Sequence, residues 1–244
     1  MLSHRAVYSL TAGKLANGSD VAEISGRLVI EAIEECDGFI FNQRIVTRTT
    51  GTHGEQSVSD LRMALWESSN GQRMRFNLSS LVDGRMVRED NGSAQLDGAG
   101  KGGTATFQGE EPATLTLPAG TLFPTAHNLA ILRMARSGGR QLPATVFDGS
   151  AEDGVYDTFT AIGRRHLDSA EAGRGQTLLQ GLASWQIRIG YFLLEQRDAA
   201  PDFEIGYTLF DNGVSGDLEL DYGDLVIAGR LSSLEALPTP ACTD

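Results

Sequence analysis

The sequence has no long apolar run, few lysines and a strong excess of acid, and each of these features excludes a class of protein. No stretch reaches the roughly 18 consecutive apolar residues of a membrane-spanning helix, so we expect no such span. The net charge is −12, and only 2 of the 20 basic residues are lysine. A surface of this charge repels nucleic-acid phosphates and anionic lipids. We therefore expect neither nucleic acid nor an anionic membrane surface as a partner.

Cysteine is almost absent too, since the chain has only Cys36 and Cys242. The two are buried thiols, part of a metal site, or one disulfide that closes nearly the whole chain. Their neighbours, Asp37-Gly38 and the tail 238–244, are typical of a surface turn and a terminus, which favours the disulfide. A structural disulfide indicates an oxidising compartment such as a bacterial periplasm. Because the first residues lack an apolar signal core, a periplasmic location implies a mature form from which a leader has been removed.

Alternation of apolar and polar residues predicts a mainly β fold. It is clearest in one segment, where every second residue is apolar: Trp185, Ile187, Ile189, Tyr191 and Leu193. The segments 203–209 and 218–222 repeat the pattern, which is typical of an antiparallel sheet with one wet face and one dry face. We predict roughly a dozen strands, with long ones over 21–33 and 181–196. Since twist accumulates in long sheets, this one should coil, and without a linker or repeat it forms one domain over residues 1–244.

Turn signals separate the predicted strands. Asn-Gly and Asp-Gly pairs favour tight hairpins and occur at 17–18, 37–38, 70–71, 83–84, 91–92, 97–98 and 212–213. The segment 168–176 is polar and glycine-rich, so we expect a loop there. The segment 124–139 differs, because it is rich in helix formers, starts with Pro124, carries Arg133 and Arg136 near its end and stops near Gly138. It predicts a single helix that covers or plugs the curled sheet.

Two local motifs resemble binding sites, but we interpret them as a hairpin tip and a solvated turn. The spacing G-x-G-x-x-G at 98–103 lies between two predicted strands, whereas a dinucleotide site needs a following helix, so we expect a hairpin tip and no cofactor. An acidic cluster offers oxygen ligands for calcium, but its spacing does not fit a calcium-binding loop, and a solvated turn is preferred. Its members are Asp148, Glu152, Asp153 and Asp157.

The histidines do not mark a catalytic or metal site. The four, His4, His53, His127 and His166, have no partner at zinc-ligand spacing. His127 lies in the predicted helix start and is interpreted as a core histidine that donates to the backbone. His166 precedes Asp168 and Ser169, the residue types of a hydrolytic triad, but no G-x-S-x-G motif is present. We expect no catalytic residue, no metal and no cofactor.

Several segments together resemble a known family over nearly the full length of the chain. The strongest is 117–127, and the others are 25–29, 36–39, 42–44, 66–68, 75–77 and 146–150. In these the chain resembles the EipB proteins, periplasmic cell-envelope integrity proteins of alphaproteobacteria that were long catalogued as a domain of unknown function. The resemblance implies a long antiparallel sheet wound as an open β-spiral, or half-barrel, around one α-helix. It also implies a structural disulfide, which maps onto Cys36 and Cys242.

The resemblance implies a role in envelope stability and stress resistance, with periplasmic tetratricopeptide-repeat proteins as partners, and no enzymatic activity. We therefore predict a non-enzymatic scaffold or binding protein for envelope components. One alternative is a carrier of a lipid, another hydrophobic ligand or a lipoprotein in a half-open β cavity. In that case the apolar face of 185–193 binds an acyl chain or a partner segment, whereas in the preferred interpretation it packs on the helix. A second alternative is a hydrolase that uses His166 or His127.

Overall fold

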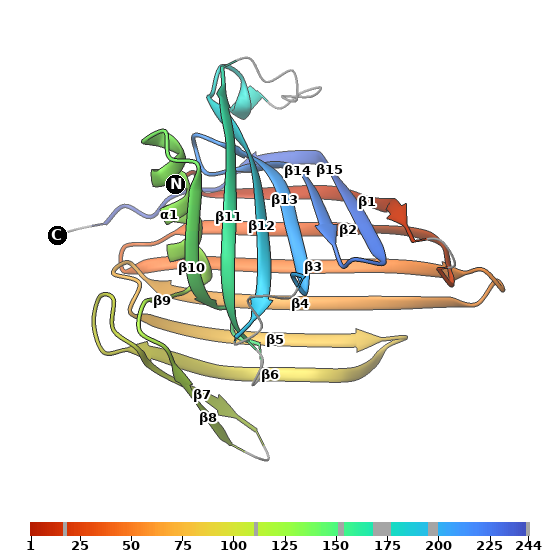
Figure 1. The fold of residues 1–244 in the computed structure, drawn as a ribbon, viewed down its shortest axis with the longest axis horizontal. Coiled ribbons are helices and arrows are strands. Elements are labelled where there is room, and N and C mark those ends of the chain that lie inside the picture. The colour runs from red at the N-terminus through yellow and green to blue at the C-terminus, as the bar shows by residue number, and fades with distance from the viewer. Residues whose placement is uncertain (17–18, 110–111, 151–153, 168–176, 195–199, 243–244) are drawn as a thin grey trace.

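One continuous sheet and one α-helix make up the computed structural model shown in Figure 1. It describes residues 1–16, 19–109, 112–150, 154–167, 177–194 and 200–242. The strands are β1 His4–Leu15, β2 Val21–Glu34, β3 Gly38–Gly51, β4 Gln56–Ser68, β5 Arg73–Val82, β6 Arg85–Leu96, β7 Gly103–Gln108, β8 Ala113–Leu117, β9 Thr121–Leu122, β10 Gln141–Phe147, β11 Val155–His166, β12 Ser184–Leu193, β13 Phe203–Phe210, β14 Ser215–Asp221 and β15 Leu225–Ala236. The helix is α1 Pro124–Arg136, and Thr177–Leu179 form a short 3₁₀ turn.

The sheet has two arms that meet where β1 pairs with β15. The strand order is β8-β7-β6-β5-β4-β3-β2-β1-β15-β14-β13-β12-β11-β10-β9, so each arm is a meander. All neighbours are antiparallel except β9 and β10. The arms form two layers whose strands cross steeply, with α1 at one end of the interior (Figure 1). The end strands β8 and β9 do not pair with each other, so the predicted open, barrel-like spiral around one helix is confirmed.

Register places one apolar face of the sheet on the inside. Tyr8 pairs with Leu28, and Leu28 pairs with Ile45, so the three side chains stand on the same face. Tyr8 and Leu28 are buried in a core cluster that Ile45 packs against. In β12, Trp185, Ile187 and Ile189 are buried while Gln186 between them is exposed, which confirms the predicted alternation.

The helix begins and ends close to the predicted residues. Pro124 occupies its first turn, Arg133 and Arg136 lie in its last turn, and Gly138 follows with a φ of 82°. Glycine suits this position because a left-handed residue ends a helix most easily without a Cβ. This helix is short, and none in the described part of the chain is long and apolar enough to cross a membrane.

Three of the strand and turn predictions need correction. The described residues form 15 strands rather than roughly a dozen, because short elements such as β9 carry little periodic signal. The strand predicted over 181–196 is shorter, since β12 covers Ser184–Leu193. Asn91-Gly92 is not a turn but lies inside β6. The turn at Asp83-Gly84 is confirmed, with φ of 51° and 77°. The turn predicted at 17–18 and the loop predicted at 168–176 lie outside the described residues.

Gly92 is in the strand because its neighbours leave no room for a side chain. A Cβ there would lie 2.2 Å from the Thr106 carbonyl oxygen and 2.5 Å from Cζ of Phe76. Glycine within a strand often marks such a close approach. Glycine at this position therefore allows the close packing of neighbouring strands. The dipeptide Asn-Gly alone does not show whether its glycine forms a hairpin turn or a close contact within a strand.

Candidate functional site: the interior of the spiral

The helix fills one end of the interior by packing on the second layer. Ile131, Leu132 and Ala135 of α1 are buried in one cluster with the apolar face of β12. The other members are Ile162, Ala183, Trp185, Ile187, Ile189 and Leu209, with Tyr191 and Tyr207 packed against them. Of the face predicted to bind a ligand or the helix, three residues belong to this cluster: Trp185, Ile187 and Ile189. Tyr191 packs against the cluster. Leu193, at the end of β12, is half-buried outside this cluster.

The first layer holds the other end of the helix through a buried carboxylate. Glu67, on β4, is 1% exposed. Its Oε1 accepts a hydrogen bond from the Thr125 backbone amide at 2.6 Å, and its Oε2 accepts one from the Ala126 amide at 3.1 Å. Phe123, which precedes the helix, supplies no side-chain cap, so Glu67 satisfies amides that a helix start leaves free. Burial raises the pKa of Glu67, while these hydrogen bonds favour its charged form.

Four phenylalanines close the interior beside the helix start. The Phe76 ring meets those of Phe107 and Phe147 edge to face, with centroids 5.2 and 5.6 Å apart, and Phe123 meets Phe147 in the same way. Phe76 and Phe107 belong to the first arm, while Phe147 ends β10 of the second. The cluster therefore joins strands of the two arms that do not pair with each other.

A second group of aromatic side chains and several partly buried apolar residues lie beside the buried clusters. Tyr156, Tyr191, Phe203 and Tyr222 form a row of ring contacts, with Tyr191 and Phe203 stacked at 4.4 Å between centroids. Tyr222, at the end of the row, is 51% exposed. Several apolar residues are only partly buried against the core clusters, among them Phe41, Ile45, Met63, Leu218 and Leu220. These side chains leave apolar surface partly exposed beside the buried clusters.

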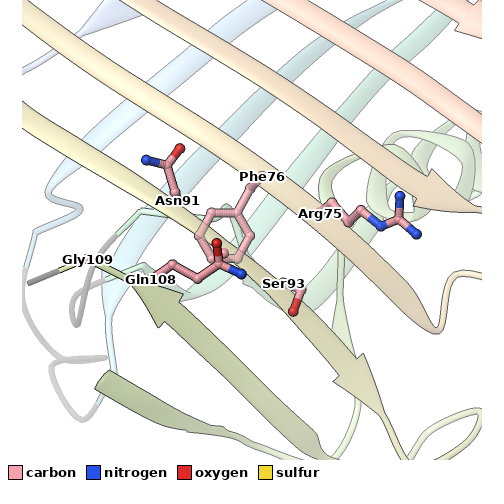
Figure 2. Close-up of a pocket in the computed structure, with 7 residues that line it drawn as sticks. Arg75, Phe76, Asn91, Ser93, Gln108 and Gly109 are labelled. Carbon is pink, nitrogen blue, oxygen red and sulfur yellow. The ribbon is translucent and has the colours of Figure 1, made fainter. Parts of the chain in front are cut away.

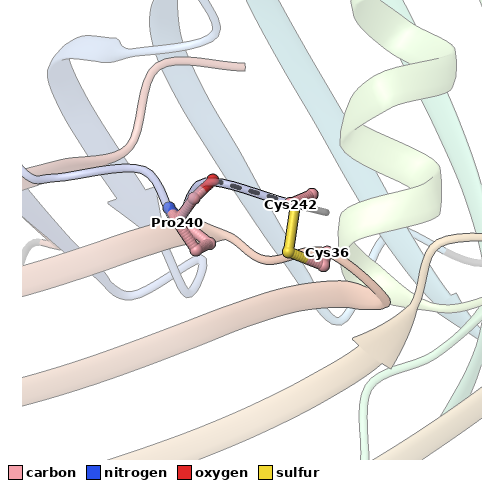
Figure 3. The surroundings of a disulfide bond; sticks show 3 residues. All are labelled: Cys36, Pro240 and Cys242. Atoms are coloured by element: carbon pink, nitrogen blue, oxygen red, sulfur yellow. Dashed lines mark hydrogen bonds between the residues drawn. A yellow bond between two sulfur atoms is a disulfide. The ribbon is translucent and has the colours of Figure 1, made fainter. Parts of the chain in front are cut away.

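The predicted disulfide is present. Cys36 and Cys242 are joined, with their Cα atoms 5.4 Å apart and 206 positions of sequence between them. Cys36 lies in the turn between β2 and β3, and Cys242 lies in the tail after β15, beside Pro240 (Figure 3). The bond holds the tail against the first arm.

The remaining candidates do not converge on a catalytic or metal site. His127 is buried, burial lowers its pKa to about 4, and its Nε2 reaches no hydrogen-bond partner among the described residues. The prediction of a core histidine is confirmed by its burial, whereas the predicted donation to the backbone is not seen at this nitrogen. His166 is exposed at the end of β11, and Asp168 and Ser169 lie outside the described residues. Residues 98–102 form the hairpin tip between β6 and β7, as predicted, with the Asp97 amide donating to the Gly102 carbonyl.

The structure describes two residues of the acidic cluster, Asp148 and Asp157. Asp148 accepts hydrogen bonds from the amide and hydroxyl of Ser150, and burial raises its pKa. Asp157 accepts one from the Thr145 hydroxyl, while Glu152 and Asp153 lie outside the described residues. In the part of the chain that the structure describes, no group of three or more His, Cys, Asp or Glu residues could hold a metal ion.

Sequence reasoning missed Glu67, although the sequence contains a signal for it. Leu61, Met63 and Leu65 occupy alternate, interior-facing positions of β4, and the next such position is a glutamate. A charged residue on a buried face needs a partner, because desolvation of an unpaired charge is costly. The partner lies 58 residues away, so spacing along the sequence does not reveal it.

Comparisons with known proteins agree on one family. The model of the EipB-like family matches residues 1–238. The chain is 30% identical over 243 residues to the cell envelope integrity protein EipB of Brucella abortus (strain 2308), covering 98% of this chain and 85% of that protein. A crystal structure described as a β-barrel-like protein of a domain of unknown function from Brucella abortus matches with a TM-score of 0.87 and 29% identity. It covers 98% of this chain and 99% of the other.

Proposed function

The chain belongs to the EipB-like family, and we propose from this membership that it maintains the integrity of the cell envelope. We propose further that it does so in the periplasm, as a non-enzymatic scaffold or binding protein for envelope components. The relative of 30% identity carries the name of a cell envelope integrity protein. The disulfide suits an oxidising compartment, since cytosolic thiols are kept reduced.

The observation that carries the scaffold interpretation is the way the helix is held. Glu67 binds its first turn from one layer, and Trp185, Ile187 and Ile189 of the other layer lie in one buried cluster with its apolar side chains. The helix end of the interior is thereby filled with the protein's own side chains. A rigid body of this kind presents fixed surfaces to other proteins, and a periplasmic tetratricopeptide-repeat protein is the partner that we propose.

Complementation of a deletion strain tests this function. Cells lacking the gene should become sensitive to detergent and cell-wall antibiotics, and the exported protein should restore resistance, whereas a form retained in the cytoplasm should not. Equal rescue by the cytoplasmic form would overturn the location. Crosslinking in intact cells should recover a tetratricopeptide-repeat protein, and its absence from the crosslinked products would remove that partner.

A double variant, His127→Ala with His166→Ala, separates the scaffold from a hydrolase. A scaffold needs no catalytic histidine. The double variant should therefore restore resistance if it accumulates in the cell and keeps its circular dichroism spectrum. A folded double variant that fails to restore resistance would favour the hydrolase instead.

A second function, transport of an acyl chain or lipoprotein, is favoured by the partly exposed apolar side chains beside the buried clusters. There the aromatic row ends at the half-exposed Tyr222, and half-buried apolar side chains continue along the first arm. Native mass spectrometry of protein purified from the periplasm should then detect bound lipid, and a fatty acid should displace an apolar fluorescent probe. Lipid-free protein from which fatty acid displaces no probe would end the carrier hypothesis.

A further inference from the structure

The outer face of the first arm carries a tryptophan flanked by two arginines. Trp66 on β4 pairs across the strands with Arg75 on β5. The guanidinium carbon of Arg75 lies 5.1 Å from the centroid of the Trp66 ring, and that of Arg73 lies 5.8 Å from it. Both arginines are exposed and Trp66 is half-buried. At these distances each guanidinium is attracted to the ring of Trp66 by a cation–π interaction, which uses none of its N–H donors.

A cleft of about 570 Å³ opens beside this group. Its lining is formed by Arg75, Phe76, Asn91, Gly92, Ser93, Gln108 and Gly109. Asn91 and Ser93 come from β6 and Gln108 from β7, and they group together while Arg75 extends to one side (Figure 2). Phe76 is the apolar side chain of the lining, but it is 4% exposed because its ring packs on Phe107 and Phe147. The polar groups that the cleft offers a ligand are therefore amide, hydroxyl and guanidinium groups.

The charge at the arginine end is not neutralised by the protein. Among the described residues neither Arg73 nor Arg75 forms a salt bridge, although Arg5, Arg44, Arg62, Arg88, Arg136 and Arg188 do. Glu89 touches the lining by accepting a hydrogen bond from Asn91 at 3.2 Å. It lies four residues along β6 from Ser93, a span of roughly 13 Å in a strand. On a chain with a net charge of −12, two unneutralised arginines beside a polar cleft are complementary to an anion.

We propose that this cleft binds a carboxylate-bearing sugar of a free glycan. The flat guanidinium of Arg75 matches the two oxygens of a carboxylate, and Asn91, Ser93 and Gln108 provide neutral donors and acceptors for sugar hydroxyls. The volume lies within the usual range for small-ligand sites. A phosphorylated sugar from a lipid headgroup brings acyl chains, and the one large apolar side chain of the lining, Phe76, is itself buried. The proposal is independent of the function of the interior.

The two tryptophans allow a direct test by NMR, since the sequence has only Trp66 and Trp185. Titration with N-acetylmuramic acid should shift the indole N–H signal of Trp66, while that of Trp185, which is 3% exposed in the interior, should stay in place. N-acetylglucosamine lacks the lactyl carboxylate and should bind at least tenfold more weakly. Glucose 6-phosphate and glucose form the corresponding pair for a phosphate. An unmoved Trp66 signal, equal binding of the two amino sugars, or a preference for the phosphate would each overturn the proposal.

Three variants locate the site. Arg75→Ala should raise the dissociation constant of N-acetylmuramic acid at least tenfold, because the variant loses the planar partner of the carboxylate. Arg75→Lys keeps the charge without the fork and should give an intermediate value. Arg48→Ala removes an exposed positive charge from β3 and should change the constant less than twofold. An equal loss in Arg75→Ala and Arg48→Ala would indicate only general attraction and would refute the site.

Discussion

Glu67 and Thr125 join the first layer of the spiral to the helix, since the carboxylate of Glu67 on β4 accepts a hydrogen bond from the Thr125 backbone amide at the start of α1, at 2.6 Å. The second carboxylate oxygen binds the next amide, that of Ala126. A negative charge at a helix start is favourable because the helix dipole is positive there. Further along the same helix, Ile131 and Leu132 are buried in one cluster with apolar residues of β12.

We expect Glu67→Gln to lower the free energy of unfolding by about 1–2 kcal/mol, because an amide offers one acceptor oxygen where the carboxylate offers two. Urea denaturation at pH 7 measures this change. Glu23→Gln, at an exposed position of β2, is the matched control and should stay within about 0.5 kcal/mol of the parent. Equal stability of the two variants would show that Glu67 does not hold the helix.

Reduction of the disulfide should destabilise the protein. The chain-entropy model gives about 5 kcal/mol for a loop of this length, an upper figure, and we expect about 2–5 kcal/mol. Denaturation curves with and without reducing agent measure the difference. The variant Cys36→Ser should match the reduced protein and no longer respond to the reagent. Superimposable curves for the oxidised and reduced parent would contradict this role for the bond.

Acidification should destabilise the protein through His127. Its folded-state pKa of about 4 lies below the ordinary 6.5, so the unfolded chain binds the proton first as the pH falls. Stability is therefore complete above about pH 6.5 and is lost between about 6.5 and 4, by about 3 kcal/mol from this group. Unfolding free energies measured across that window test the slope.

The matched histidine variants are His127→Gln and His53→Gln, the latter at an exposed position. His127→Gln should flatten the pH dependence, and His53→Gln should leave it unchanged. Some slope should remain in His127→Gln, because burial also lowers the pKa of His4. An unchanged slope in His127→Gln would show that this ring is not held neutral by the fold.

Gly92→Ala should cost about 1–3 kcal/mol, since a Cβ at this position collides with the Thr106 carbonyl and the Phe76 ring and forces the strand or the ring to move. Gly206→Ala is the matched control, also inside a strand, where the nearest atom to a new Cβ lies 3.7 Å away. The control should be neutral or slightly stabilising. Thermal melting compares the two, and an equal effect would contradict the packing argument for Gly92.

The β fold, the helix and the buried face of β12 could be predicted because each depends on a local pattern. Trp185, Ile187 and Ile189 alternate with polar or small residues, and Pro124 and Gly138 mark the two ends of a helical segment. The turn at Asp83-Gly84 was predicted for the same reason, and both residues adopt positive φ. The identical logic failed at Asn91-Gly92, where contact with Phe76 from the neighbouring strand decides the conformation.

The class of fold, the buried face of strands such as β12 and the two sulfur atoms available for a bond could be read from the sequence, since periodicity, turn chemistry and a count of two cysteines are local properties. The capping of the helix by Glu67, the position of Arg73 and Arg75 around Trp66 beside a cleft, and the place of the helix at one end of the interior depend on the folded arrangement. These arrangements arise when a twisted sheet coils, because coiling brings together residues from distant strands whose spacing in the chain carries no trace of their contact.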